Sequence, residues 1–428
     1  MFFLESSLPF LKVLAAFAAM LAGIRLRMPL SLSILCGGVL LGIFFGLGPV
    51  SIIQACGYAL VEEKFLLLAA IVGLILILSD ALERSGQSKR LMDVLSGYLT
   101  RPRLRLVFFP ALIGLLPMPG GAIFSAPLTD AASKEMDMNN TQRALINYWF
   151  RHIWELAWPL YPGFILIVAL ADIPITVFIS RTWPAVFIML GIGWFFFLRP
   201  GILRVKRYKN HSSAGKQGLK AVFVQGLPLI VAILGSVGLE CLLPVFAPKV
   251  PFEIGVVAAL VVSIICIMAQ NRLGREFTRQ ILTKKSLYSM LMVIAAIFMF
   301  KETMYAADVV GAMADAAGED AALFAAAVFL PFLVGMVSGI TVAFVGSTFP
   351  LLLGIIDTLG IQGQMLPYLV LASFAGFTGV LVSPLHICFI LTCRFFRVDV
   401  ARAWRKLVMP SLIFAACGFF LFLFLLKV

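Results

Sequence analysis

Long apolar runs separated by short polar connections constrain this chain more than any other feature. Hydrophobic residues make up 61% of the 428 residues and charged residues only 13%, and the mean hydropathy is +1.04, far above that of soluble domains. A β-barrel would instead show short segments of alternating hydrophobicity. The sequence therefore predicts an all-α polytopic membrane protein, with ten crossings expected near residues 8–24, 29–47, 65–79, 147–171, 183–198, 222–246, 252–269, 286–300, 366–391 and 408–426.

The net charge of +13 comes from basic residues in the connections between apolar runs. This distribution follows the positive-inside rule and differs from the basic, aromatic-rich surface that a nucleic-acid-binding protein would need. We therefore expect no nucleic-acid partner and a multi-pass location in the bacterial inner membrane, with both termini external. The connections assigned to the cytoplasm are residues 25–27, 84–105, 199–220, 272–285 and 394–406.

Two apolar segments, residues 106–133 and 321–356, are interrupted by proline, glycine and hydroxyl residues. As helix the first would measure ~42 Å, whereas two crossings of a hydrocarbon core need about 60 Å. The second would measure ~54 Å, which leaves two thin crossings open beside a re-entrant hairpin. Every basic connection lies in the cytoplasm if both segments are re-entrant and enter from opposite sides.

A weak internal repeat relates the two halves of the chain. PLYPGFIL at 159–166 aligns with PLHICFIL at 384–391, and Ser125 aligns with Ser347 at a similar spacing. Each half would contain five crossings and a hairpin, and an odd number of crossings inverts the second repeat. The predicted organisation is a first inverted repeat at 1–209 (scaffold helices 1–79, hairpin 106–133, broken helix 147–171), a basic cytoplasmic linker at 210–220, and a second inverted repeat at 221–428 (scaffold helices 222–300, hairpin 321–356, broken helix 366–391).

The tips of the two predicted hairpins form the first candidate site. Non-helical backbone at membrane depth is tolerated where protein or a water-filled cavity satisfies its N–H and C=O groups, and transporters place binding sites there. The alternative is that these small residues only let helices pack closely. The substrate-binding candidates are Pro117, Pro119, Gly120, Gly121 and Ser125 in the first tip, and Ser338, Gly339, Thr341, Gly346, Ser347 and Thr348 in the second.

The segment NYWFRHIWELAWPLYPG, residues 147–163, places three ionisable side chains in an otherwise apolar run. Charge inside a membrane is costly, so such residues usually pair or face a cavity. Arg151 and Glu155 are four residues apart and would share one helix face. We interpret Arg151, His152 and Glu155 as ion-coupling residues, the alternative being that the arginine extends to the cytoplasmic interface.

Prolines interrupt the same place in both halves, at Pro159 and Pro384, and put Tyr161 and His386 at equivalent positions. All four are substrate-binding candidates, because broken helices expose backbone groups to a ligand. A histidine beside a helix break can coordinate an anion or carry a proton. It can also simply bond a neighbouring carbonyl.

Motifs for enzymatic chemistry are missing from the sequence, which contains no GxSxG, HExxH or Walker-type phosphate loop. The seven cysteines lie mostly in apolar runs without paired spacing, as expected of small buried residues. His152 and Glu155 lack other candidate metal ligands in their half of the chain. We therefore expect no enzyme activity, no metal and no cofactor other than a coupling Na⁺ or H⁺.

The motifs PMPGGAIFSAPL, NYWFRHIWELAWPLYPG and SPLHICFILT resemble those of an uncharacterised family of bacterial integral membrane proteins, domain of unknown function 401, in the ion transporter superfamily. The resemblance spans nearly the whole chain. Relatives in that superfamily include gluconate permeases, citrate transporters and divalent anion:sodium symporters. The resemblance implies an elevator-type fold, with a scaffold domain that is often dimeric and a moving domain that holds two hairpins and two broken helices. The Ser-Asn-Thr signature of the dicarboxylate branch is absent from both tips.

These observations predict a secondary active transporter of a small anionic metabolite, such as an organic or sugar acid, coupled to H⁺ or Na⁺. The expected partners are this substrate, the lipid bilayer and a second copy of the chain. A non-transporting membrane subunit or a lipid-processing scaffold is the alternative, and it predicts no polar cavity between the two hairpins. A channel is disfavoured, because the sequence offers no ring of repeated polar residues.

Overall fold

The computed structural model describes residues 2–99, 101–115, 121–134, 136–200, 202–205, 218–317 and 319–427, which are all-helical apart from one pair of two-residue strands. This confirms the predicted polytopic helical membrane protein. Nine helical segments in these ranges are long and apolar enough to cross a bilayer: Leu8–Arg25, Glu63–Arg84, Ile175–Leu198, Leu219–Phe246, Phe252–Gln270, Lys285–Ala306, Thr341–Thr358, Gln362–Leu381 and Val400–Leu425.

The nine candidate crossings differ from the ten expected at three places. Helix α2 (Leu30–Phe44) is only 15 residues long, and the run at 147–171 is split into two shorter helices. Conversely, Thr341–Thr358 is long enough to span, although the sequence assigned it to a hairpin. The two sets differ because hydropathy reports only how apolar a segment is. Proline and glycine residues determine where a helix ends within such a segment.

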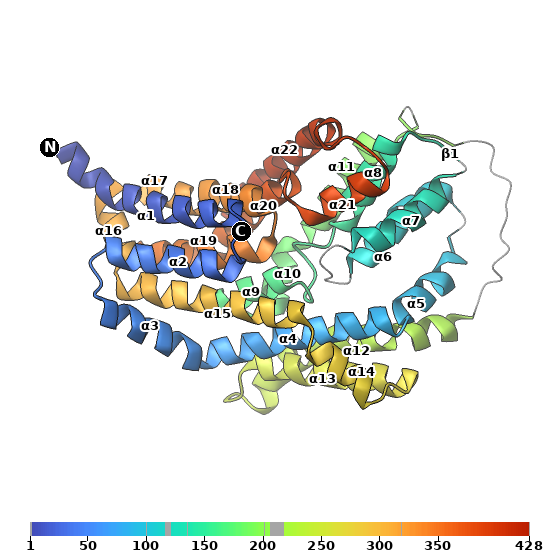
Figure 1. Cartoon of the computed structure of the whole chain (residues 1–428), viewed down its shortest axis with the longest axis horizontal. Coiled ribbons are helices and arrows are strands. Elements are labelled where there is room, and N and C mark those ends of the chain that lie inside the picture. The colour runs from blue at the N-terminus through green and yellow to red at the C-terminus, as the bar shows by residue number, and fades with distance from the viewer. Residues whose placement is uncertain are drawn as a thin grey trace.

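A layer of three long helices forms one side of the molecule. Helix α4 (Glu63–Arg84) packs against α13 (Phe252–Asn271), and α13 packs against α12 (Leu219–Phe246), along the lower part of Figure 1. Helix α5 (Gln87–Ser96) contacts α4 and α12, and α14 (Arg275–Leu282) contacts α4. Helices α4, α12, α13 and α14 lie largely in the scaffold regions of the two predicted repeats, so the layer joins the two halves of the chain.

Helix α15 (Lys285–Ala306) lies between this layer and the N-terminal helices. It packs against α2, α3 (Pro49–Val61) and α4, while α1 (Phe2–Arg25) covers α2 (Figure 1). A Cβ added at Gly38 of α2 would touch the Phe300 backbone, so glycine permits the close approach of α2 and α15.

Each segment predicted as a hairpin forms two adjacent helices. Helices α6 (Pro102–Gly114) and α7 (Ala122–Ser133) pack together, as do α18 (Leu330–Ser338) and α19 (Thr341–Thr358). Gly339 makes the second turn in the left-handed region, with φ of 66°. Pro117, Pro119 and Gly120 of the first tip lie outside the described residues.

Two helices are interrupted immediately after these pairs. Helix α8 (Asn140–Arg151) stops, a non-helical stretch follows, and α9 (Pro162–Ala171) begins with proline at its first position. Helix α20 (Met365–Leu381) likewise stops before α21 (Ile387–Phe395). Proline cannot donate a backbone hydrogen bond and clashes with the preceding turn, which explains why Pro159 and Pro384 lie in the breaks.

The other elements connect or cover these helices. Helix α22 packs against α20, α11 and α8, and β1 pairs with β2 in antiparallel register. Their bounds, with those of the remaining elements, are β1 (Met136–Asp137), α10 (Ile175–Thr182), α11 (Pro184–Gly193), the π-helix η1 (Trp194–Leu198), β2 (Arg204–Val205), α16 (Val309–Ala317), α17 (Glu319–Phe324), the π-helix η2 (Ala325–Phe329), the 3₁₀-helix η3 (Gln362–Gln364) and α22 (Val400–Leu425).

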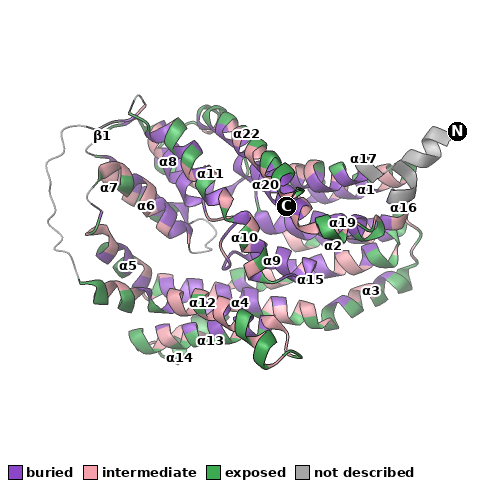
Figure 2. Cartoon of the chain, turned by 180° about the vertical axis from the view of Figure 1, so that it is seen from behind, coloured by how far each residue is buried: buried purple, intermediate pink, exposed green. Residues whose placement is uncertain are grey.

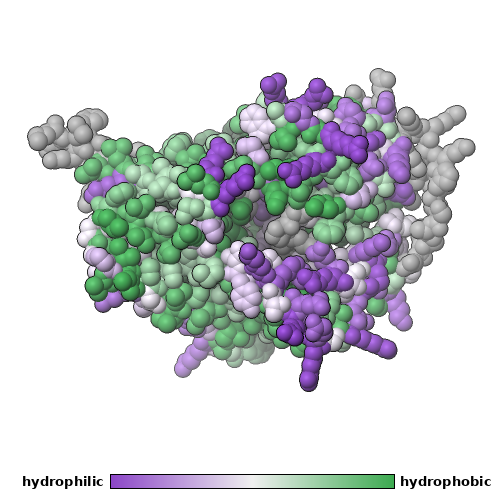
Figure 3. All heavy atoms as spheres, in the orientation of Figure 1, coloured by the Kyte–Doolittle hydropathy of each residue, from purple (hydrophilic) through white to green (hydrophobic). Residues whose placement is uncertain are grey.

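The distribution of buried residues and of polar surface residues is consistent with a membrane environment. Figure 2 shows buried residues concentrated on α9, α19 and α20, whereas α3, α12 and α14 carry exposed ones. In Figure 3 hydrophobic side chains cover the face over α1, α2 and α3, and hydrophilic side chains gather at the opposite end. A bilayer is therefore the natural environment of these apolar helices.

Candidate functional site

The two helix breaks meet inside the protein, and each contributes one histidine. His152 directly follows α8, and His386 directly precedes α21. Their Nε2 atoms lie 3.0 Å apart, and the two residues are only 2% and 9% exposed. Residues that the sequence assigned separately to ion coupling and to substrate binding are therefore direct neighbours.

Both imidazoles are anchored through their other nitrogen. His152 Nδ1 lies 2.6 Å from the Tyr148 carbonyl oxygen, and His386 Nδ1 lies 2.5 Å from the Gly339 carbonyl oxygen. A carbonyl oxygen can only accept, so each Nδ1 must carry the hydrogen and donate it. In the neutral rings this leaves a lone pair on each Nε2, and the two lone pairs point toward the same small region.

An aromatic side chain packs against both histidines. The Tyr148 ring centroid lies 4.7 Å from that of His152 and 5.6 Å from that of His386. Its hydroxyl donates to the Leu381 carbonyl oxygen at 3.0 Å, at the end of α20. Tyr148 was not predicted from the sequence, because an aromatic residue in an apolar helix looks like an ordinary core residue.

Glu155 connects the first break to the second helix pair. Thr341 Oγ1 donates to Glu155 Oε1 at 2.6 Å, and Thr341 is the first residue of α19. A carboxylate at a helix N-terminus is favoured by the helix dipole. Gly163 allows α9 to approach, since a Cβ there would contact the Thr341 side chain. Glu155 and Thr341, predicted in different roles, therefore form one contact.

Arg151 lies against the first helix pair. The residue is 3% exposed, and a Cβ added at Gly121 would collide with its guanidinium. A Cβ at Gly114 would likewise collide with the Arg151 carbonyl oxygen. Because α8 ends at Arg151, the helical spacing on which we based a pair with Glu155 does not continue past it. Tyr161 adds a further link, donating its hydroxyl to the Gly114 carbonyl oxygen at 2.5 Å.

Asn147 links three helices next to the cluster and was also missed from the sequence. Its Oδ1 accepts from Thr129 of α7 at 3.0 Å, and its Nδ2 donates to Thr392 of α21 at 3.2 Å. All three side chains are fully buried. The only available sequence signal was an amide within an apolar run, which does not identify its partners.

Several predicted tip residues make hydrogen bonds within their own helices or turns. Ser125, Ser347 and Thr348 donate their hydroxyls to carbonyl oxygens of their own helices. Ser338 also donates to its helix, at Val334, and its hydroxyl accepts from the Ile340 amide in the turn. Gly346 packs against Ile297 of α15, where a larger residue would clash.

Comparison with known proteins establishes the family. A family model described as a protein of unknown function, DUF401, matches residues 11–425. The chain belongs to the DUF401 family. The match includes both helix breaks and confirms the family-level resemblance seen in the motifs, while the link to the ion transporter superfamily stays a prediction. None of the curated proteins compared with the chain matches it.

The DUF401 chain places a thiol beside its histidine pair. The side chains of His152, His386 and Cys388 are all buried, and one potential ligand atom of each lies within 4.8 Å of the others. We predicted no metal centre because the first half offered too few ligands. The fold changes that premise, since the second half supplies the additional histidine and the thiol.

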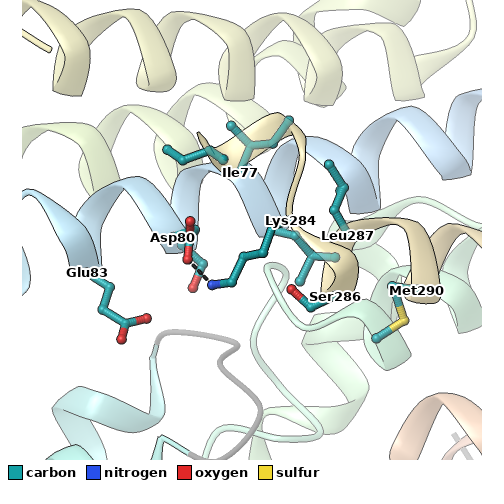
Figure 4. A pocket seen from close by; sticks show the side chains of 10 residues that line it. Ile77, Asp80, Glu83, Lys284, Ser286, Leu287 and Met290 are labelled. Carbon is teal, nitrogen blue, oxygen red and sulfur yellow. Dashed lines mark hydrogen bonds and ion pairs between the residues drawn. The ribbon is translucent and has the colours of Figure 1, made fainter. Parts of the chain in front are cut away.

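A second polar location in this DUF401 chain lies between α4 and the start of α15. Asp80 forms ion pairs with Arg84, at 2.9 Å, and with Lys284. Figure 4 shows the Asp80 and Lys284 side chains directed toward each other beside a cavity of about 190 Å³, with Glu83 nearby. Ile77 and Met290 make much of its wall apolar. We interpret the Asp80–Lys284 ion pair as a structural contact that holds α4 against the start of α15.

Proposed function

We propose that this DUF401 protein is an elevator-type secondary active transporter in the bacterial inner membrane. It moves a small anionic metabolite, such as an organic or sugar acid, and couples this movement to H⁺ or Na⁺. The observation that carries the proposal is that the two helix breaks combine in one buried polar cluster, through His152 with His386 and through Glu155 with Thr341. Buried polar groups at broken membrane helices are characteristic of transport sites.

The order of elements supports an inverted repeat. In each half a helix pair, α6–α7 or α18–α19, is followed by an interrupted helix, α8–α9 or α20–α21. We propose that the pairs are re-entrant hairpins and that they move with the interrupted helices. The long helices α4, α12, α13 and α15 would form the scaffold, which dimerises with a second copy, and both termini would be external.

The charges at the cluster support an anionic substrate. Arg151 supplies a buried positive charge next to Gly121 in the first helix pair. The carboxylate of Glu155 is already engaged by Thr341 at the start of α19. An anion approaching this region therefore meets the Arg151 guanidinium, a group that binds carboxylates by charge-assisted hydrogen bonds. We assign no enzymatic activity to the chain.

A non-transporting subunit or lipid-processing scaffold is the alternative function. It predicts that the junction between the helix breaks serves only as packing and therefore has no need of polar groups. Burying unpaired polar groups costs roughly 1–3 kcal/mol each, so an apolar junction would be the more stable choice for a scaffold. The buried His152–His386 contact and the Glu155–Thr341 bond favour the transporter.

The test begins with a thermal-shift screen of purified protein against organic acids, sugar acids and phosphorylated metabolites, with and without Na⁺. Compounds that stabilise the protein are then offered to proteoliposomes under imposed H⁺ or Na⁺ gradients. We expect gradient-driven uptake of at least one anion. Failure of every stabilising compound to be taken up under either gradient would overturn the proposal.

A matched pair of variants tests coupling at the cluster. Glu155→Gln keeps an oxygen that can accept from Thr341 but removes the charge, whereas Glu276→Gln makes the same change on the exposed surface of α14. We expect Glu155→Gln to reduce cation flux per substrate at least about tenfold, because an ionisable residue inside the membrane marks a proton or ion pathway. Glu276→Gln should leave the flux unchanged, and equal behaviour of the two variants would remove Glu155 from the coupling role.

A further inference from the structure

We propose that His152, His386 and Cys388 form a binding site for one Zn²⁺ ion at the junction of the two helix breaks. The ligands are the Nε2 atoms of the two imidazoles and the Cys388 thiolate. One potential ligand atom of each residue lies within 4.8 Å of the other two, and all three residues are buried. This inference does not depend on transport, since it concerns only what the cluster binds.

The two imidazoles are oriented as metal-binding histidines usually are. Metal-binding histidines almost always donate their second ring N–H to a carbonyl or carboxylate, which fixes the ring and leaves the other nitrogen free to bind. Here Tyr148 and Gly339 supply the two carbonyl oxygens, 2.6 and 2.5 Å from the Nδ1 atoms. Both free Nε2 lone pairs consequently converge, and they repel each other unless a cation lies between them.

The distance between the nitrogens fits a metal with little adjustment. Zn²⁺ binds histidine nitrogen at ~2.0–2.1 Å, which in tetrahedral geometry separates two nitrogens by about 3.3 Å. The observed separation is 3.0 Å. Parting the rings by a few tenths of an ångström is enough to place the ion between the two nitrogens.

The thiol distinguishes a metal ion from a shared proton. One proton between the two Nε2 atoms would satisfy both histidines without a thiolate, and Cys388 would then only hydrogen-bond to the two rings. A borderline-soft ion such as Zn²⁺ uses imidazole and thiolate ligands together, and its charge removes the thiol proton. Cys388 lies two residues after His386, at the second position of α21, so a single helix start supplies two of the three ligands. Three protein ligands leave one tetrahedral position open.

The charges that face the cluster are compatible with a divalent cation. Glu155 is close enough to interact electrostatically with His386, and Arg151 with Cys388. The Cys388 thiolate and the Glu155 carboxylate together offset the two charges of the ion. Tyr148 and Phe389 form part of the apolar surroundings, and such a shell strengthens metal–ligand interactions by excluding water.

Metal binding to the purified full-length chain tests the proposal. Chelator-stripped protein is titrated with Zn²⁺, with bound metal measured by mass spectrometry, and with Co²⁺ as a spectroscopic probe. We expect about one ion per chain and a thiolate-to-cobalt absorption band. Cys388→Ser should abolish the band and weaken Zn²⁺ binding at least about tenfold, and His386→Gln should weaken it similarly. Cys393→Ser is the matched control, because Cys393 is buried on the same helix outside the cluster.

Two results would overturn the site. Wild-type protein that binds neither ion would show that the histidines share only a proton. Equal binding by wild type, Cys388→Ser and His386→Gln would place any bound ion elsewhere. Because metal binding is measured without substrate or gradient, its failure leaves the transport test unaffected, and a failed uptake assay leaves the metal result unaffected.

Discussion

His152 and His386 are 234 positions apart in the sequence, yet their Nε2 atoms lie within 3.0 Å. Each histidine directly adjoins a helix end, where the chain has just left or is about to enter regular structure. Within a continuous helix the backbone groups are directed along the helix axis. At these breaks the chain leaves that geometry, so the His152 and His386 side chains can approach each other from the two halves of the chain. The pair therefore depends on the correct packing of both halves.

Removing the threonine hydroxyl that contacts Glu155 should destabilise the protein. Thr341→Val leaves the carboxylate without a hydrogen bond that is 2.6 Å long in the wild type. We expect the free energy of unfolding to fall by about 1–3 kcal/mol, the cost of losing a partner of a poorly hydrated charged group. Thr341→Ser keeps the hydroxyl and should lose less than about 1 kcal/mol. Thermal unfolding in detergent, followed by tryptophan fluorescence, measures both, and equal losses would contradict the prediction.

Adding one methyl group at Gly114 should disturb the first helix pair. A Cβ there would overlap the backbone carbonyl of Arg151, which cannot rotate away. Gly114→Ala should therefore cost about 1–3 kcal/mol through overpacking. The control is Gly191→Ala in α11, where the added methyl meets nothing within 4 Å. That change should be neutral or slightly stabilising, so a destabilisation as large as that of Gly114→Ala would show that the cost is not steric.

Neutralising Asp80 should weaken the contact between α4 and α15. Its carboxylate is 7% exposed and faces both Arg84 and Lys284, so Asp80→Asn leaves two like charges together. We expect a loss of about 1–3 kcal/mol in unfolding free energy. Asp130→Asn is the control, because Asp130 is 40% exposed and contacts Arg143 at 3.4 Å. An exposed pair of this kind contributes roughly 0–1 kcal/mol to stability. If the two variants lost equal unfolding free energy, burial of the Asp80 carboxylate would not be the cause of its larger predicted effect.

Zinc affinity should fall as the pH is lowered. Both imidazoles must be neutral and the thiol must lose its proton before they can bind the ion, so protons compete with zinc at every ligand. Affinity should therefore drop at least about tenfold between roughly pH 7.5 and 5.5. Zinc titration across this range measures the trend. Affinity that is independent of pH would exclude histidine ligation.

The sequence predicted the membrane class and the positions of the interruptions because these depend on local physical properties. Apolar run length determines which segments can span a bilayer, and proline at 159, 162 and 384 determines where helices stop. Arg151, His152 and Glu155 were recognisable because an ionisable residue in an apolar run is costly. These properties need no knowledge of which segments meet.

The contacts of the cluster could not be predicted in the same way. Nothing local to Thr341 identifies Glu155 as its acceptor, and Cys388 resembles the other cysteines in apolar runs until the fold brings it to His152. The expected pair between Arg151 and Glu155 assumed a continuous helix, which in fact ends at Arg151. Contacts between residues far apart in the sequence depend on tertiary packing, which a hydropathy pattern does not predict.

The Asn147 amide determines which helices can be displaced together. It bonds Thr129 of α7 and Thr392 of α21 from its own position on α8, in a fully buried setting. Sliding α7 past α21 would break these bonds at a cost of roughly 1–3 kcal/mol for each group left unsatisfied. The bonds of Asn147 therefore resist separate displacement of α7, α8 and α21, whereas a displacement that moves the three helices together would leave these bonds intact.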